Sequence, residues 1–190
     1  IAKKRAVVPP DEAGVRHYYG LDRWPDGEAR LDLGGRVVHV LPAPGHNGNH
    51  VVFFDEATGL LFSGDFLMPG RITVDDAAAF EAGARRIAAF ARGRRVTHVL
   101  GGHVEMDAEG GLYPMHATWH PHERRLDLDK ADLLALPQAL ADFNGFYSRH
   151  PHFVITHPVR NLAALGAFAL LVLALVAWLA VRLFRRRRSK

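Results

Sequence analysis

Between residues 29 and 63 the chain consists of short runs in which apolar and polar residues alternate or β-branched residues follow one another. Both patterns are typical of strands. The runs pair as two hairpins, the first with the turn signal Gly34-Gly35 and the second with a turn at 56–59. The predicted strands are residues 29–33, 36–41, 51–54 and 60–63.

Two later segments have the composition of helices. Residues 75–92 are rich in alanine and other helix formers, and Asp75 and Gly93 are expected to mark the start and the stop of this helix. Residues 130–147 form the second predicted helix, with an irregularity at Pro137.

Strands and helices interleave along the chain, since a further strand is expected at 95–100, between the two helices. Residues 1–28 hold several Pro and Gly and are expected to be mostly loop, with a short element around 15–19. This order predicts a layered α/β (α+β) domain.

The C-terminal part is apolar on every side. The twenty residues from 162 to 181 are all hydrophobic except Gly166, and at 1.5 Å per residue they cover the hydrocarbon core of a bilayer, about 30 Å. A surface amphipathic helix would have one apolar stripe instead. A buried core helix is disfavoured by Trp178 near the end of the run and by the arginines that follow it.

We therefore expect a domain at 1–160, one transmembrane helix at 161–184 that contacts the lipid bilayer through 162–184, and a basic tail at 185–190. Six of the 24 Lys and Arg follow residue 161, with none of the 20 Asp and Glu, so residues 1–161 hold 18 bases and 20 acids, a net charge of −2. The basic character belongs to the tail, and nucleic-acid binding is not expected of the domain. The positive-inside rule predicts a cytoplasmic C-terminus and a domain on the outer side, periplasmic or extracellular.

A domain on the outer side needs an export signal. The first ten residues, IAKKRAVVPP, contain no Met and no apolar h-region. Two explanations are open: the topology is inverted, with a cytosolic domain anchored by its tail, or the chain lacks its natural start. In both cases the chain is a single-pass membrane protein.

Polar, metal-competent residues follow predicted strands at three places, each flanked by Gly or Pro. They are His46, Asp65 and His103. Loops at strand ends carry ligand sites in layered α/β folds. Cysteine is absent, which excludes thiol nucleophiles and iron–sulfur clusters. Two His and one Asp suit one or two divalent metal ions, with zinc the default and iron or manganese as alternatives.

Taken singly, a loop His is usually only solvated, and a Gly-Asp after a strand is usually a turn or a helix cap. The order of the three segments along the chain favours a site. PAPGHNGNHVVFF at 42–54, LLFSGD at 60–65 and THVLGGH at 97–103 together resemble the C-terminal half of the metallo-β-lactamase-fold hydrolases, with their PGHTxGH segment, SGD segment and late histidine.

The resemblance implies the C-terminal half of an αββα sandwich with a mono- or dinuclear metal site, followed here by one transmembrane helix. It implies that His46 binds one metal, that His103 binds a second, and that Asp65 bridges them. Asn47 stands where the family often has Thr, and His50 matches a frequent family His that need not bind metal, so both are candidates for supporting the ligands.

The family's principal motif, HxHxDH, does not occur in this sequence, where His17 is followed by Tyr18-Tyr19. The three donors alone give each metal one terminal ligand and a shared Asp, fewer than the three protein ligands of a catalytic zinc. We therefore expect a C-terminal piece of a longer exported, membrane-anchored protein that is inactive by itself. Half a sandwich would also expose the apolar sheet face formed by 36–41 and 51–63.

Other polar residues lie near these motifs. Glu105 and Asp107 are candidates for steadying His103, with solvated surface carboxylates as the alternative. The segment HATWHPH is expected to line the mouth of the site, with a metal clip as the alternative, because Pro121 prevents a regular helix there. Its histidines are His116, His120 and His122.

Three functions are open. The first is a zinc-dependent hydrolase that uses metal-bound hydroxide on a small-molecule ester, thioester, amide or phosphoester, with Asp65 as the catalytic residue that holds the metals and orients the nucleophile. The second is a membrane-anchored, non-catalytic remnant, a metal-binding or partner domain. The third is a zinc-buffering protein that uses the His-rich loop 116–122. The fold does not choose a substrate.

Overall fold

The chain divides into two compact units, Ile1–Thr156 and His157–Lys190. The computed structural model describes residues 11–188. The predicted loop at residues 1–10 and the end of the predicted basic tail, residues 189–190, lie outside the described residues.

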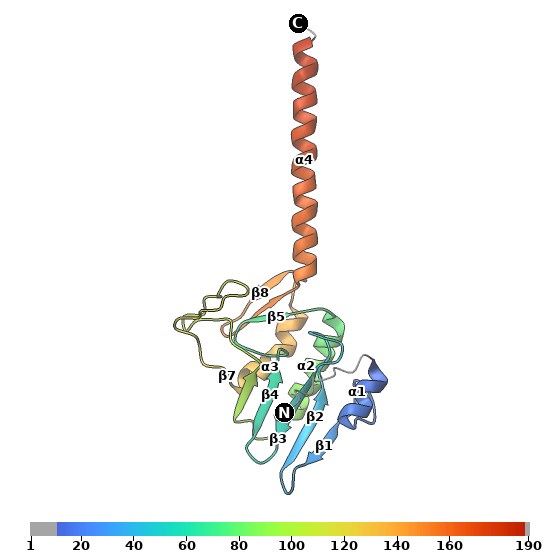
Figure 1. Ribbon diagram of the computed structural model, residues 1–190, viewed down its shortest axis with the longest axis vertical. Helices are drawn as coiled ribbons and strands as arrows, with labels where there is room; N and C mark the ends of the chain where they lie inside the picture. The colour runs from blue at the N-terminus through green and yellow to red at the C-terminus, as the bar shows by residue number, and fades with distance from the viewer. Residues whose placement is uncertain (1–10, 189–190) are drawn as a thin grey trace, which may run out of the picture. The chain divides into compact units, whose positions relative to one another are not determined.

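A six-stranded sheet forms the larger layer of the first unit (Figure 1). Its order is β1-β2-β3-β4-β6-β7, and all neighbours are antiparallel except β4 and β6, which are parallel. Both predicted hairpins are present, and the strand expected at 95–100 begins at His98. The strands are β1 (Ala29–Asp32), β2 (Val37–Pro42), β3 (Val51–Asp55), β4 (Leu60–Gly64), β6 (His98–Gly101) and β7 (Asp127–Leu128).

A second sheet has the order β5-β9-β8, with β5 parallel to β9 and β8 antiparallel to it. Its strands are β5 (Arg71–Thr73), β8 (Tyr147–Arg149) and β9 (Val154–Thr156). The sequence did not predict them, because three residues are too few to show a period of two.

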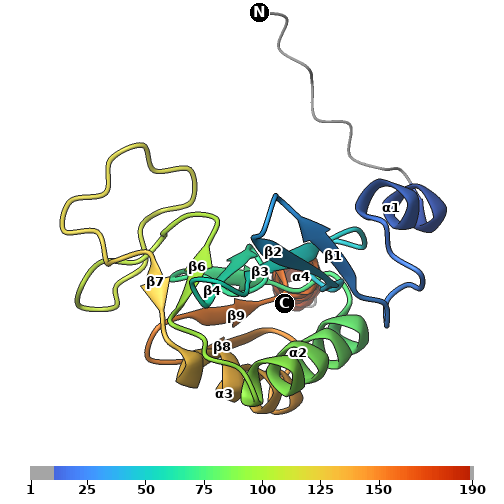
Figure 2. The same ribbon diagram turned by 90° about the horizontal axis from the view of Figure 1, so that it is seen from below.

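Two helices, α2 (Ala77–Arg92) and α3 (Lys130–Ala141), pack side by side on one face of the larger sheet (Figure 2). The predicted N-cap of α2 was wrong by one residue: the Asp76 side chain accepts a hydrogen bond from the Ala79 N–H at 3.0 Å. The N–H of Asp75 instead donates to Gly45 O at 2.8 Å, which ties the start of α2 to the loop before β3.

Helix α3 ends at Ala141, so the helix predicted at 130–147 was wrong over its last six residues. The side chain of Asn144 accepts the N–H groups of Phe146 and Tyr147, at 2.9 and 3.1 Å, and turns the chain into β8. Asn favours such local side-chain bonds over helix continuation.

One hydrophobic core lies between the larger sheet and the two helices. The smaller sheet joins it through Ile72 of β5 and Ile155 of β9. Each large apolar side chain buried there stabilises the unit by about 1.5–3 kcal/mol. Fully buried members include Phe54, Leu61 and Val99 from strands of the larger sheet, Phe80 and Ile87 from α2, Leu133 and Leu136 from α3, and Ile155 from β9.

The opposite face of the larger sheet is covered only in part. Helix α1 (Glu12–Tyr19) and the residues after it place Val15 and Leu21 against Val40 of β2. On β4, by contrast, the Phe62 side chain is 41% exposed. The exposed apolar face expected from the sequence is therefore smaller than predicted, because α1 covers β1 and β2.

The second unit consists of α4 (Pro158–Arg188). Its first 25 residues, Pro158–Arg182, are long and apolar enough to cross a membrane by length and composition, and none of the span is buried. The expected apolar helix is therefore present. Most of its Leu, Val and Phe side chains are exposed.

A buried carboxylate at the end of β3 makes the first unit sensitive to acid. Hydrogen bonds from Arg36 and Thr58 lower the pKa of Asp55 from 3.8 to about 2. A folded-state pKa below the unfolded value gives stability that is complete above pH 3.8 and lost as the pH falls to about 2. We expect the urea midpoint of Asp55→Asn to fall less steeply over this pH range than that of the wild type. Equal slopes in paired urea titrations would contradict this role of Asp55.

Candidate functional site

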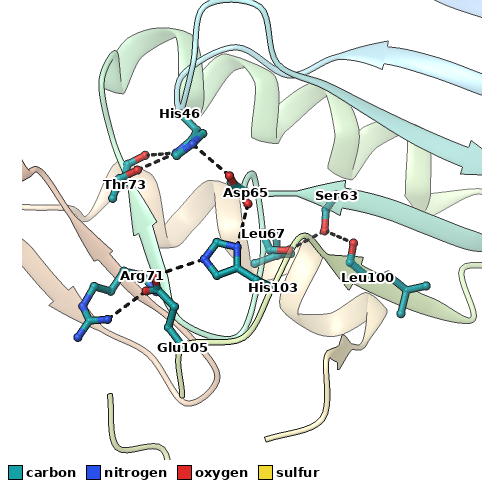
Figure 3. A network of polar contacts seen from close by, with 9 residues as sticks. All are labelled: His46, Ser63, Asp65, Leu67, Arg71, Thr73, Leu100, His103 and Glu105. Carbon is teal, nitrogen blue, oxygen red and sulfur yellow. Dashed lines mark hydrogen bonds and ion pairs between the residues drawn. The ribbon is translucent and has the colours of Figure 1, made fainter. Parts of the chain in front are cut away.

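The three residues singled out at strand ends come together at one end of the larger sheet (Figure 3). Asp65 follows β4 and His103 follows β6, and these strands are adjacent and parallel. His46 enters from the loop between β2 and β3. Its Nε2 lies 3.5 Å from Asp65 Oδ2, and His103 Nδ1 lies 3.3 Å from Asp65 Oδ1. One carboxylate thus stands between two imidazoles.

Glycines allow the close approach around Asp65. Gly64 has a φ of +55°, and the register between β4 and β6 shifts at this point. Gly102 donates its N–H to Gly64 O at 3.0 Å, and a Cβ at Gly102 would lie 2.7 Å from Asp65 Oδ1. A side chain at position 102 would therefore push the carboxylate out of place.

Gly45, which precedes His46 in the chain, and Thr73, which contacts its ring, fix the position of His46. Gly45 has a φ of +131°, and a Cβ there would lie 2.2 Å from the Phe80 Cβ. The His46 Nδ1 lies 2.7 Å from Thr73 Oγ1 and 3.2 Å from the Thr73 carbonyl oxygen. A proton on Nδ1 can be donated to that carbonyl, which leaves the lone pair of Nε2 directed at Asp65.

His103 is held by a second carboxylate. Its Nε2 lies 3.3 Å from Glu105 Oε1, and Glu105 Oε2 accepts from the N–H and the guanidinium of Arg71, both at 3.1 Å. Burial alone would raise the pKa of Glu105, but the hydrogen bonds from Arg71 and His103 outweigh it and lower the pKa. Asp107, the other candidate, accepts from the Gly111 N–H at 2.6 Å and shapes a turn instead.

The two support candidates from the sequence lie in the loop of His46. The His50 ring stands edge-on to His46 at 6.0 Å and stacks on Phe66 at 6.3 Å. Burial, and secondarily the neighbouring His46, lower the pKa of His50 to about 4, so it is neutral at pH 7. Asn47 is exposed, and its Oδ1 accepts from the Asn49 N–H at 2.9 Å. His50 therefore packs beside a site residue, while Asn47 shapes the loop.

The His-rich segment is not joined to these residues. Among the described residues, no hydrogen bond or ion pair links His116, His120 or His122 to His46, Asp65 or His103. The His120 ring instead stacks on Tyr113 at 4.3 Å. Whether the segment lines the mouth of the site stays a prediction.

Sequence reasoning missed Thr73 and Arg71. Both lie in β5, and the pairing of β5 with β9, more than eighty residues away in the chain, places this strand beside the site. No local pattern marks them. Their role could be found only from the three-dimensional arrangement.

The donor chemistry suits a divalent metal, because neutral imidazole and carboxylate are ligands that zinc takes. The two histidines, however, approach different oxygens of Asp65. Among residues 11–188 no group of three or more His, Cys, Asp or Glu side chains is arranged to hold a metal ion. The described residues therefore do not form a complete metal site by themselves.

The comparison with protein families gave a match to the metallo-beta-lactamase superfamily over residues 3–141. The comparison with curated proteins gave no match. Similar solved structures include a metallo-beta-lactamase superfamily protein from Sulfolobus tokodaii (16% identity, 61% of this chain and 38% of that one, TM-score 0.38). Others are a metallo-beta-lactamase from Pontibacter korlensis (16%, 58% and 46%, 0.39) and ETHE1 from Myxococcus xanthus (20%, 61% and 50%, 0.35).

This chain spans at most half the length of these three solved structures. The family match, in contrast, covers most of the chain and contains His46, Asp65 and His103. The chain belongs to the metallo-beta-lactamase superfamily.

Proposed function

We propose that this chain supplies one side of the metal centre of a metal-dependent hydrolase. His46 and His103 would each bind a metal ion, and Asp65 would bridge the two. The observation that carries the proposal is that imidazole nitrogens from two separate loops approach opposite oxygens of Asp65, at 3.5 and 3.3 Å. The remaining ligands would come from residues other than these three.

The surroundings of the two histidines support ligand roles. A metal-binding His is normally oriented by a hydrogen bond from its other ring nitrogen to a carbonyl or carboxylate. His46 has Thr73 in this position, and His103 has Glu105. Glu105 is anionic at neutral pH, so it can accept the His103 Nε2 proton and leave the Nδ1 lone pair facing Asp65.

A bound divalent ion, with zinc the default and iron or manganese as alternatives, would supply an activated water and an electrophile for the substrate. Asp65 would position the ions and orient the attacking group. The neutral His50 and the ring of Phe66 behind it would limit access of water from the core side. The substrate would be a small-molecule ester, thioester, amide or phosphoester.

The experiment isolates the protein and measures its metal content and its rate of hydrolysis of small-molecule ester, thioester, amide and phosphoester substrates. His46→Ala and His103→Ala are expected to lower both, whereas His116→Ala, in the exposed loop, is expected to leave both unchanged. A metal-free natural protein, or His46→Ala with unchanged metal and rate, would end this proposal.

A second candidate is a membrane-anchored, non-catalytic remnant that binds metal weakly or serves as a partner domain, favoured by the lack of a three-ligand group among the described residues. It predicts weak metal binding or none, and no hydrolysis in the wild type. Two tightly bound zinc ions per chain would count against it. A zinc-buffering role predicts instead that deletion of 116–122 removes most of the metal while His103→Ala does not.

The contact between the Thr73 hydroxyl and His46 Nδ1 gives a second test of the metal site, with an intermediate expected effect. Thr73→Val removes the hydroxyl 2.7 Å from Nδ1 but keeps the carbonyl at 3.2 Å. Because loss of such a supporting group costs 10–100-fold in metal affinity, we expect a zinc dissociation constant about 10-fold higher. The matched control is Thr97→Val, whose hydroxyl donates to Thr58 O, away from the site. Equal affinities in the two variants would contradict the role of Thr73.

We also propose that α4 inserts in a lipid bilayer, with the basic end in the cytoplasm and the first unit on the outer side. Leu171→Arg puts a charge near the middle of the apolar span, which costs about 3 kcal/mol of insertion free energy. We expect alkaline carbonate to extract this variant from membranes. Leu162→Arg, near the end of the span, should stay in the membrane because its side chain can reach the interface. Equal retention of both variants would contradict insertion.

A further inference from the structure

A turn at one end of the first unit exposes two aromatic side chains. Phe146 is 47% exposed and Tyr147 is 44% exposed. The turn is well defined, because Asn144 Oδ1 accepts the N–H groups of both residues. Tyr147 pairs with Thr156 in the β8–β9 ladder, so these rings lie beside the last residue of the unit.

The connection from this edge to α4 is short. Thr156 ends β9 and Pro158 begins α4, and two residues span at most about 7 Å. Paired residues on neighbouring strands lie about 5 Å apart. The Tyr147 backbone is therefore within about 12 Å of the first residue of the apolar helix, whatever direction that helix takes.

The lower half of this range falls within the headgroup layer of a bilayer. The polar layer adds about 5–7 Å on each side of the hydrocarbon core. Tyrosine is enriched at that depth, because its ring is apolar and its hydroxyl hydrogen-bonds to water and headgroups. Exposed aromatic rings are unfavourable in water and favourable there.

The candidate site is attached to the same edge. In the β5–β9 ladder Thr73 pairs with Thr156, and Thr73 is the residue that holds His46. In the first unit, β5 and β8 lie at one end and the β1–β2 hairpin at the other (Figure 1). A membrane contact at Tyr147 would thus hold the His46 side of the unit toward the lipid.

We propose that the turn of Phe146 and Tyr147 is a membrane-contact surface that docks the first unit on the bilayer that α4 spans. This interaction goes beyond metal binding and hydrolysis, and it rests on the insertion of α4. The expected partner is lipid, because the apolar helix that we propose to be inserted begins two residues after this edge.

The test uses the full chain, reconstituted in phosphatidylcholine vesicles. Because the sequence contains no cysteine, single variants can be spin-labelled at one position each: Phe146→Cys in the turn, Leu33→Cys in the distant hairpin and Leu171→Cys in α4. Leu33 is the matched control, an apolar side chain that is 66% exposed. Collision with lipid-soluble oxygen and with a water-soluble nickel chelate reports the surroundings of each label. Tyr147→Cys repeats the measurement from the neighbouring side chain.

We expect nickel accessibility to be several-fold lower at position 146, and at position 147, than at position 33, with position 171 reached by oxygen alone. Labels at 146 and 147 as open to nickel as the label at 33 would overturn the docking surface. A label at 171 that is open to nickel would overturn insertion and docking together. Spin-label accessibility depends on neither metal binding nor hydrolysis. A negative result would therefore count against the membrane contact and not against the proposed hydrolase.

Discussion

Replacing Asp65 with alanine is expected to raise the zinc dissociation constant of the natural protein by more than about 100-fold. Among residues 11–188, Asp65 is the carboxylate that lies between the two candidate imidazoles, with one oxygen toward each. Loss of a residue that merely orients a ligand costs 10–100-fold in affinity, so loss of a shared ligand should cost more. Competition with a chromophoric chelator measures the constant.

The same substitution should leave the fold intact. The Asp65 side chain is 41% exposed, and surface changes of this kind alter the free energy of unfolding by about 0.5 kcal/mol or less. Asp127→Ala is the matched control, since Asp127 pairs with Arg125 away from the site. Equal zinc affinity in Asp65→Ala and Asp127→Ala, with both folded, would remove Asp65 from the metal site.

Replacing Phe80 with alanine is expected to cost about 3–5 kcal/mol of unfolding free energy, as a large-to-small change in a closed core does. Phe80 is completely buried in the first turn of α2, and its ring packs on Phe66 at 5.1 Å. Phe66 follows Asp65, and the Phe80 backbone lies directly under Gly45, which precedes His46. The cavity would therefore open beneath two of the three site residues.

Urea titration of the full chain in detergent measures this effect. Phe62→Ala is the matched control: Phe62 is 41% exposed, so its loss should cost no more than about 1 kcal/mol. We also expect Phe80→Ala to weaken zinc binding, because His46 and Asp65 lose their support. If Phe80→Ala lowered the free energy of unfolding by no more than Phe62→Ala, Phe80 would not be a main stabilising residue of the core next to the site.

Local pattern predicted the parts of the fold that are locally determined. The hairpins around Gly34-Gly35 and Gly59, and helix α2, follow from alternation, turn residues and helix formers. Strands β5, β8 and β9 were missed because their pairing is between distant segments and each is three residues long. The helix predicted to reach residue 147 ends earlier, because Asn144 accepts the N–H groups of Phe146 and Tyr147. Composition alone does not reveal these side-chain hydrogen bonds.

The proximity of the three candidate residues could be expected from the sequence, whereas their role as ligands stays a prediction. Each of His46, Asp65 and His103 follows a strand and has a glycine beside it, and the structure brings all three together. Thr73 and Arg71 could not be found from the sequence, because they reach these residues only through the ladder of β5 with β9. Glu105 was recognisable by its position two residues after His103, while Asp107 had the same proximity and serves a turn.

Metal bound around Asp65 would be seen directly in crystals of the protein measured on both sides of the zinc absorption edge. We expect anomalous density within about 2.0–2.2 Å of Asp65 and of the facing nitrogen of His46 or His103. Density only at His116, His120 and His122, or none in the protein, would contradict it.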